Sequence, residues 1–216
     1  MKKYILILTL VITFVSYSQT VYEVTPGTKG NEIKLTVANV SETNPATNVI
    51  VKPHPTLSKG EGFQEAPITF HQSEQTIDII NSGEEKEVTF RFDVNRNTPI
   101  NKKDTIDLMI TSSDGLMMMK TFIFSYTGPK EFKLEQNFPN PFNPTTTIQY
   151  QLPTDARVTL KVYDILGSEV ATLVNEEQEA GYKEVNFNGI NYASGMYVYR
   201  LMAGKYISTK KMMLLK

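Results

Sequence analysis

The side chains that most often perform catalysis are few in this chain, and their spacing fits no known chemistry. The only histidines are His54 and His71, and neither lies in a His-Glu-x-x-His or other metal-binding pattern. His54 stands between two prolines, where a solvated imidazole is the default expectation. The sequence contains no Gly-x-Ser-x-Gly elbow and no phosphate-binding Gly-x-x-x-x-Gly-Lys loop. These residues therefore predict neither a nucleophile with its base nor a phosphate site.

The acidic residues form two groups that could be considered for acid–base chemistry. Glu84, Glu85 and Glu87 follow a glycine, and a charge run beside a turn is usually a solvated face. Asp104 and Asp107 are separated by an odd number of residues on an expected strand, so their side chains point to opposite faces. Such a pair is a poor general acid and base, because both carboxyl groups must reach one bond.

Metal and thiol chemistry is equally poorly represented. Asp114 or Glu61 could bind calcium from a loop, but no Asp-x-Asp-x-Asp loop accompanies them. The chain has no cysteine, which excludes disulfides, thiolate metal sites and a cysteine nucleophile. We therefore expect no catalytic residue, no metal site and no cofactor, and a protein that is not an enzyme.

Charge and composition divide the chain into two blocks. The chain has 216 residues, 40% of them apolar, which is enough for one or two domains with their own cores. Its net charge of −1 argues against nucleic acid as a partner. Residues 21–129 carry 10 basic and 14 acidic side chains, a net of −4, whereas residues 130–216 carry 10 and 9, a net of +1. This change predicts a domain boundary near residue 129.

The N-terminus has the pattern of a secretory signal peptide. Lys2 and Lys3 precede an apolar run from Tyr4 to Val15, which is too short for the ~20 residues that span a bilayer. Small residues follow at Ser16 and Ser18. We expect signal peptidase to cleave between Ser18 and Gln19, the alternative being a retained anchor.

The front block reads as β-structure throughout. Alternating apolar residues predict strands over residues 32–40, 49–51, 76–80, 87–94, 105–111 and 116–126. The last two are separated by Ser113-Asp114-Gly115, a strong hairpin signal. About seven short strands with intervening turns are typical of an immunoglobulin-like antiparallel sandwich. The long loop from Pro53 to Pro67 and the nearby Phe63, Phe70 and His71 are candidates for a binding patch.

A proline-rich stretch, Asn137–Pro144, which we call the proline strap, introduces the back block. Its three prolines exclude a helix or central strand and favour a stiff, extended segment. Behind it, alternation predicts strands around residues 147–152, 158–162, 170–174, 185–187, 196–202 and 206–215. The whole chain is thus expected to be all-β, with two immunoglobulin-like sandwiches in tandem.

Four segments of the back block carry a family resemblance. They are the run of twelve residues from Asn137, the segment from Val158 to Gly167, and the segments Ala193–Arg200 and Thr209–Lys216 near the C-terminus. In this order and spacing they resemble the C-terminal sorting domain of type IX secretion cargo, over residues 132–216. The fold is also similar to the immunoglobulin-like part of flagellar hook-capping proteins.

The resemblance implies an export route and its partners. Cargo of this family crosses the inner membrane by its signal peptide, and the type IX secretion machinery recognises the folded tail at the outer membrane. A surface peptidase removes the tail and can join the cargo to lipopolysaccharide. The segments that match the family's motifs place the sorting signal at the following residues: Pro139, Asn140, Pro141, Tyr163, Asp164, Gly167, Gly195, Tyr197, Lys210 and Lys211.

Each of these residues also has a purely structural interpretation. Pro139, Pro141, Gly167 and Gly195 fit turn and strap geometry, through which any effect on secretion would act. Lysines 205, 210, 211 and 216 give the last hairpin a basic side that an acidic partner could recognise. They also fit edge-strand residues that prevent aggregation, and the two interpretations stay open.

The expected organisation has four parts: a signal peptide at 1–18, a cargo sandwich at 19–128, a linker at 129–137 and a sorting sandwich at 138–216. The favoured function is a secreted or surface-attached binding or adhesion module for a protein or glycan. The alternative is an extracytoplasmic scaffold that keeps both sandwiches, by analogy with hook-capping proteins. Fold analogy alone does not separate the two.

Overall fold

The computed structural model describes residues 21–55 and 67–216, which form fifteen β-strands and no helix. The expected signal peptide at 1–18 and its cleavage site between Ser18 and Gln19 lie outside these residues. So do Phe63 and most of the loop between Pro53 and Pro67.

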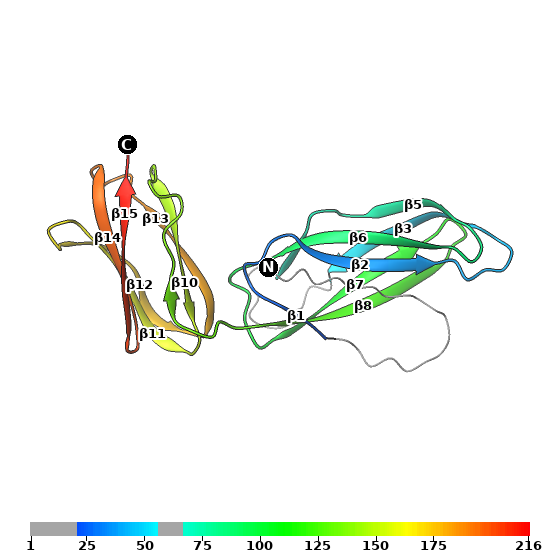
Figure 1. Cartoon of the computed structure of the whole chain (residues 1–216), viewed down its shortest axis with the longest axis horizontal. Coiled ribbons are helices and arrows are strands. Elements are labelled where there is room, and N and C mark those ends of the chain that lie inside the picture. Colours follow the sequence, from blue (N-terminus) through cyan, green and yellow to red (C-terminus); the bar gives the residue numbers. More distant parts are fainter. Residues whose placement is uncertain (1–20, 56–66) are drawn as a thin grey trace. The chain divides into compact units, whose positions relative to one another are not determined.

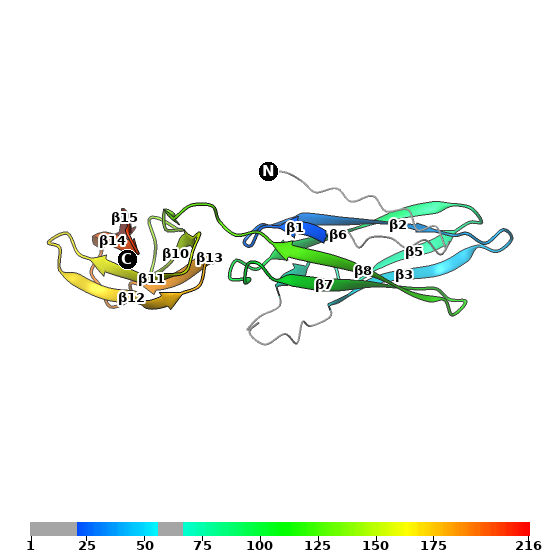
Figure 2. The same ribbon diagram turned by 90° about the horizontal axis from the view of Figure 1, so that it is seen from below.

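The strands divide between two compact units, each of which has its own core. Unit 1 comprises Met1–Asn95 and Asn101–Tyr126, and unit 2 comprises Arg96–Ile100 and Thr127–Lys216. Each unit contains two sheets that share one hydrophobic core (Figures 1 and 2). The predicted all-β fold with two immunoglobulin-like sandwiches in tandem is confirmed.

Unit 1 packs a five-stranded sheet against a three-stranded sheet. The five-stranded sheet has the order β1-β8-β7-β3-β5: β1 (Val21–Val24), β8 (Met117–Tyr126), β7 (Lys103–Thr111), β3 (Ala46–Pro55) and β5 (Gln75–Ile80). The other has the order β2-β6-β4: β2 (Asn31–Ala38), β6 (Glu85–Val94) and β4 (Ile68–Phe70). Only the pairing of β1 with β8 is parallel among these strands.

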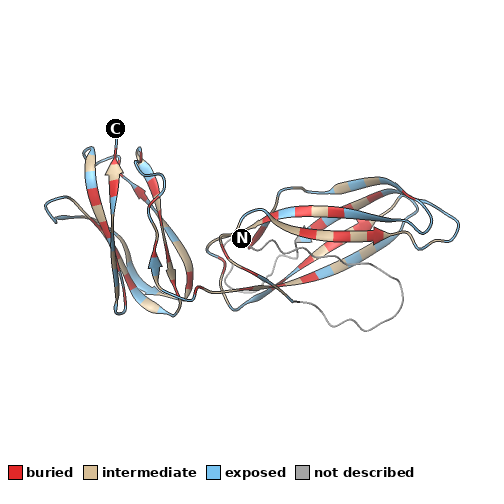
Figure 3. Cartoon of the chain, in the orientation of Figure 1, coloured by how far each residue is buried: buried red, intermediate tan, exposed pale blue. Residues whose placement is uncertain are grey.

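The strands of unit 1 follow from the alternation of apolar residues. Ile33, Leu35 and Val37 of β2 are buried, and the residues between them are not (Figure 3). Phe90 and Phe92 of β6 fill the centre of the same core. Because successive side chains of a strand point to opposite faces, this pattern turns one face of each sheet toward the core.

β3 differs from its expected length. The sequence predicts a short strand closed by Pro53, whereas β3 continues to Pro55. Among the described strands, β3 pairs beyond Val51 with β7 alone, so this half is an edge of the described sheet, where a missing backbone N–H is tolerated. The short strands β1 and β4 were not predicted, because neither contains enough residues for a clear period.

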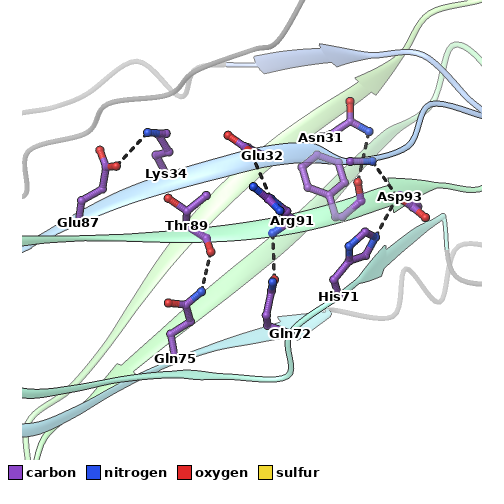
Figure 4. Close-up of polar contacts among 12 residues, drawn as sticks. Asn31, Glu32, Lys34, His71, Gln72, Gln75, Glu87, Thr89, Arg91 and Asp93 are labelled. Carbon is purple, nitrogen blue, oxygen red and sulfur yellow. Dashed lines mark hydrogen bonds and ion pairs between the residues drawn. The ribbon is translucent and has the colours of Figure 1, made fainter.

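Polar side chains link the strands on the outer face of the three-stranded sheet (Figure 4). Lys34 pairs with Glu87 at 3.0 Å between Nζ and Oε1, and the Nε of Arg91 lies 3.2 Å from Oε1 of Glu32. These pairs are solvent-exposed in part, so each contributes little to stability.

Unit 2 has the same two-layer plan with shorter connections. Its four-stranded sheet has the order β12-β11-β14-β15: β12 (Glu169–Gln178), β11 (Ala156–Tyr163), β14 (Gly195–Ala203) and β15 (Tyr206–Leu214). Its three-stranded sheet has the order β13-β10-β9: β13 (Gly181–Asn188), β10 (Thr145–Leu152) and β9 (Lys133–Leu134). The strand β9 lies inside the stretch expected to be a linker, and Leu134 belongs to the core of unit 2.

Candidate functional site

The proline strap connects the two sheets of unit 2. Near its start, Phe138 exchanges two backbone hydrogen bonds with Thr147 of β10, at N–O distances of 3.0 and 2.9 Å. Near its end, the N–H of Phe142 donates to the carbonyl of Met213 at 2.9 Å, and Leu215 donates back to Phe142 at 3.0 Å. The strap is therefore anchored to one strand of each sheet.

A buried asparagine holds the bend of the strap. Asn137 is only 2% exposed, and its Nδ2 donates to the carbonyl of Pro139 at 3.1 Å and to the hydroxyl of Thr146 at 2.9 Å. Its backbone N–H donates to the hydroxyl of Tyr199 at 2.8 Å, and that hydroxyl donates to the carbonyl of Glu135. Since buried polar groups are costly when unpaired, this network fixes one conformation of the strap.

The strap is bent rather than extended as its sequence predicts. Bends occur at Pro139, Asn140 and Pro141, and the peptide bonds before the three prolines are cis. The side chains of Asn137, Thr146 and Asn140 make the hydrogen bonds that hold these bends. The expectation of an extended segment came from the φ preference of proline alone and took no account of these hydrogen bonds.

The strap and Gln136, the residue directly before it, cover part of the outer edge of β15, the last strand. The side-chain amide of Gln136 donates to the carbonyl of Lys211 at 2.7 Å, and the N–H of Met213 donates to Oδ1 of Asn140 at 2.9 Å. Phe142 is buried, and its ring lies edge-on to that of Phe187. Backbone groups that an edge strand would leave unpaired are thus satisfied within the unit.

The turn between β11 and β12 is built around a single carboxylate. One carboxylate oxygen of Asp164 accepts the N–H groups of Leu166 and Ser168, both at 2.9 Å. Gly167 has a φ of +86°, which side chains other than glycine rarely adopt. The same turn displays Ile165 and Leu166, the latter 86% exposed. These contacts favour the structural interpretation of Asp164 and Gly167.

Residues from distant motifs meet in one row across the four-stranded sheet. Tyr163 of β11 lies opposite Val198 of β14, which lies opposite Lys211 of β15. The guanidinium of Arg200 lies 4.9 Å from the ring centroid of Tyr163, and its Nη2 donates to the phenolic oxygen at 2.8 Å. A cation over an aromatic face is attracted to it, which fixes both side chains on the outer surface.

The first residues of β14 lie near the end of β15. Gly195 pairs with Leu214, and Tyr197 pairs with Met212. Tyr197 is buried, and its hydroxyl donates to the carbonyl of Ala193 at 2.8 Å. Tyr197 is therefore a core residue with a satisfied hydroxyl group.

The four lysines of the last hairpin do not share one surface. Lys210 and Lys211 are consecutive in β15 and point to opposite faces, with Lys210 half-buried and Lys211 exposed. The Nζ of Lys216 donates to the carbonyl of Ile190 at 2.7 Å. A continuous basic side of the hairpin is thus not formed, and Lys211 is the lysine that accompanies Arg200 on the outer face.

Burial changes the titration of two tyrosines in the core of unit 2. It raises the pKa of Tyr199 to about 12 and that of Tyr150 to about 12. Both hydroxyl groups are hydrogen-bonded, Tyr150 to Oε1 of Gln178 at 2.8 Å. These groups stay neutral at physiological pH and serve as hydrogen-bond partners rather than as acids.

Sequence reasoning missed the residues that shape this site from within. They are buried residues of the strap or of the strands and turns that contact it, and one exposed residue directly before it: Asn137, Phe142, Gly189, Tyr199 and Gln136. A Cβ on Gly189 would lie 2.9 Å from Cδ2 of Leu214, so this position has no room for a side chain. The signal in the sequence was an asparagine directly before an aromatic residue and a run of prolines, which a periodicity search does not detect.

The site offers shape and exposed apolar residues rather than a reaction centre. Phe138 of the strap is 80% exposed, and Leu166 is more exposed still. Over residues 21–55 and 67–216, no group of three or more histidine, aspartate or glutamate side chains is placed to hold a metal ion. The same residues contain no helix that is long and apolar enough to cross a membrane.

Comparison with known protein families identifies the domain. Residues 136–215 match the family model described as "Secretion system C-terminal sorting domain". The back of the chain is therefore a sorting domain of type IX secretion cargo, and the protein is exported by this route. Such a domain indicates passage through the periplasm, followed by surface attachment or release, and interaction with the type IX machinery.

Comparison with solved structures adds only distant likenesses, and a search of curated proteins found no match. The CupB2 chaperone of Pseudomonas aeruginosa is 12% identical, with 90% of this chain and 96% of that chain covered, at a TM-score of 0.32. Latent PorU of Porphyromonas gingivalis is 15% identical, with 93% and 19% covered, at a TM-score of 0.33. The human desmocollin-1 ectodomain is 9% identical, with 90% and 35% covered, at a TM-score of 0.32. The assignment of the fold thus depends on the sheets described above.

Proposed function

We propose that unit 1 is a non-enzymatic binding or adhesion module and that unit 2 is the label that exports it. The main support is the position of the sorting domain, because its match begins at residue 136 and leaves unit 1 outside it. Unit 1 also presents exposed apolar side chains on a sheet face, at Met117 and Met119. Exposed apolar side chains grouped on a sheet face are a common property of binding surfaces.

We propose a different binding surface from the one around Phe63, Phe70 and His71 that the sequence suggested. Phe70 is partly buried, and its ring lies against those of Phe90 and Phe92. His71 is engaged by Asp93, with Nε2 and Oδ1 3.0 Å apart. Phe70 is thus largely used by the core, and the outer face of the five-stranded sheet is the better candidate for ligand contact.

We further propose that the secretion machinery reads the strap together with the edge of β15. Pro139, Asn140 and Pro141 are exposed, and Asn140 also bonds to β15. In this proposal, Tyr163 and Lys211 belong to the recognised surface, on the outer face of the four-stranded sheet. The other predicted residues affect export only by maintaining the folded structure: Asp164, Gly167, Gly195, Tyr197 and Lys210. The sorting signal is then a folded surface, and peptides that contain its separate segments do not replace it.

The remaining partners belong to the processing steps of the same route. Signal peptidase would cleave between Ser18 and Gln19, and the surface peptidase would remove unit 2. Lipopolysaccharide is the proposed attachment point of the released unit 1, whose ligand is a protein or glycan.

The decisive experiment is intact mass and terminal-peptide mapping of the protein from its native cells and medium. We expect a species that begins at Gln19 and ends between residues 128 and 137, with added mass if lipopolysaccharide is attached. A full-length species that ends at Lys216 and stays in the periplasm would contradict the proposal. The scaffold that retains both sandwiches would then be the better description.

A further inference from the structure

Three methionines occupy neighbouring positions on the outer face of the five-stranded sheet of unit 1. Met109 of β7 lies directly opposite Met119 of β8, and Met117 follows two residues away on the same face. Directly opposite residues have Cβ atoms ~5 Å apart, and residues two apart on a strand are separated by ~7 Å. The three thioethers therefore start from Cβ positions within reach of one common point, because methionine has three rotatable side-chain bonds.

These methionines are not used by the core of the unit. Met117 is 67% exposed and Met119 is 61% exposed, whereas the intervening Met118 packs against the core. Met109 is half-buried between Met119 and Lys52 of the neighbouring strand. A leucine would serve a solvated strand position as well, so packing does not account for the thioethers.

Among the described residues, no strand flanks the cluster on the β1 side of β8. β1 pairs with β8 only from Ile123 to Tyr126, so no described strand lies beside Met117 and Met119 on that side. Among the described strands, these two residues thus stand at an edge of the sheet as well as on its outer face. Within the described part of the chain, no strand has to move for a small ion to reach them.

We propose that Met109, Met117 and Met119 form a thioether site for a monovalent soft metal ion, Cu(I). Thioether sulfur is a soft donor that selects Cu(I) over hard divalent ions, which prefer carboxylates and carbonyls. Three neutral thioethers do not offset the positive charge of the ion. A negative charge is supplied nearby by Asp107, which lies two residues from Met109 on the same face of β7. Lys52 opposes it, but its chain is exposed and free to extend into water.

The proposed thioether site uses different ligands from those of zinc and calcium sites, which are built from histidine and carboxylate groups. The described part of the chain contains no three-membered group of histidine, aspartate or glutamate that could hold a metal ion, which argues against zinc or calcium there. A thioether site does not depend on such groups, and it does not depend on the sorting function of unit 2.

The test is an anaerobic titration of the chain, expressed from Gln19, with Cu(I) in ascorbate and bicinchoninate as the competing chelator. We expect one Cu(I) per chain, and shifts of the ε-methyl resonances of three methionines by nuclear magnetic resonance. Met117→Leu and Met119→Leu should each weaken Cu(I) binding at least about tenfold, and the triple variant with Met109→Leu should abolish it. Leucine conserves volume, so circular dichroism should show an unchanged fold.

The matched control is a pair of exposed methionines in unit 2. Met196 and Met202 are 41% and 39% exposed, and Met196→Leu/Met202→Leu should leave Cu(I) affinity unchanged. His54→Gln should also leave it unchanged, since the proposal contains no imidazole ligand. Failure of the wild-type chain to compete with bicinchoninate, or equal binding by the triple variant, would overturn the proposal.

Discussion

The hydroxyl group of Tyr199 bridges two backbone groups of the segment that enters unit 2: it accepts the N–H of buried Asn137 and donates to the carbonyl of half-buried Glu135, both at 2.8 Å. Tyr199 belongs to β14, more than sixty residues further along the chain. A core strand thus positions the strap, which is the most irregular part of the domain, through one oxygen atom.

Replacement of Tyr199 by phenylalanine should therefore destabilise unit 2 more than an exposed hydroxyl deletion does. The Tyr199→Phe variant leaves a buried N–H and a carbonyl without partners, which costs about 1–3 kcal/mol. Urea unfolding followed by circular dichroism measures the change. Tyr163→Phe is the control, because it removes a hydroxyl that bonds to exposed Arg200 and should cost under about 0.5 kcal/mol. Equal losses in the two variants would contradict the role of Tyr199.

Alkaline pH should unfold the protein as its buried tyrosines are forced to ionise. Burial raises the pKa of Tyr150 to about 12, and burial and then the charge of Asp104 raise the pKa of Tyr126 in unit 1. A folded pKa above the unfolded value of ~10 gives a contribution that is complete below pH ~10 and is lost as pH rises through the folded pKa. Urea midpoints should fall from about pH 10 upward, less steeply for Tyr150→Phe than for wild type.

Gly189 should not tolerate a methyl group. A Cβ at this position would lie 2.9 Å from Cδ2 of Leu214 and 3.1 Å from Cε2 of Phe142, both in the buried core. Overpacking of this kind costs about 1–3 kcal/mol, so Gly189→Ala should lower the urea midpoint accordingly. The cost should be smaller in a Leu214→Val background, because the nearest obstructing atom is removed. If the two substitutions lower the free energy of unfolding additively, the clash between the new Cβ and Leu214 is not the cause of the loss.

The sequence predicted most strands of both units, because their apolar residues alternate and their turns contain glycine. In unit 2, alternation of Val158, Leu160 and Val162 placed β11, and all three side chains are buried. The odd separation of Asp104 and Asp107 correctly placed them on opposite faces, with Asp104 buried and Asp107 half-exposed. Local periodicity sufficed wherever one face of a strand meets a core.

The structure of the strap could not be predicted in the same way. Its bends depend on Thr146, Tyr199 and Met213, which lie in three different strands. Contacts between residues this far apart leave no local pattern in the sequence. The faces of Lys210 and Lys211 follow instead from local alternation, because consecutive residues of a strand point to opposite faces.

Acid should weaken unit 1 in part through Asp93. The backbone N–H of Gly30, 2.8 Å from Oδ1, lowers the pKa of Asp93, and His71 adds to this effect. A lowered folded pKa gives stability that is present above the unfolded value and lost as pH falls through the folded pKa. Asp93→Asn should lower the urea midpoint at pH ~7 and should reduce the difference between pH ~7 and pH ~3. Asp78→Asn on the exposed part of β5 controls for charge, and an equal response there would contradict the assignment.

Export should depend on Asn140 more than on its neighbour in the strap. The side chain of Asn140 accepts the N–H of Met213 at 2.9 Å and joins the strap to the last strand, and Asn143 is exposed. If the secretion machinery reads the strap and β15 as one surface, Asn140→Ala should cause the protein to accumulate in the periplasm, whereas Asn143→Ala should be exported normally. Immunoblots of periplasm and medium measure the distribution, with unit 1 as the epitope.

The stability of the two variants separates recognition from folding. Loss of one exposed hydrogen bond costs about 0.5–1.5 kcal/mol, which leaves unit 2 folded at growth temperature if its stability is typical. Retention of a folded Asn140→Ala protein would then reflect a changed surface rather than degradation. Normal export of that variant would mean that the strap and β15 are not read together, and that the exposed turn at Leu166 or the row of Tyr163 and Lys211 carries the signal instead.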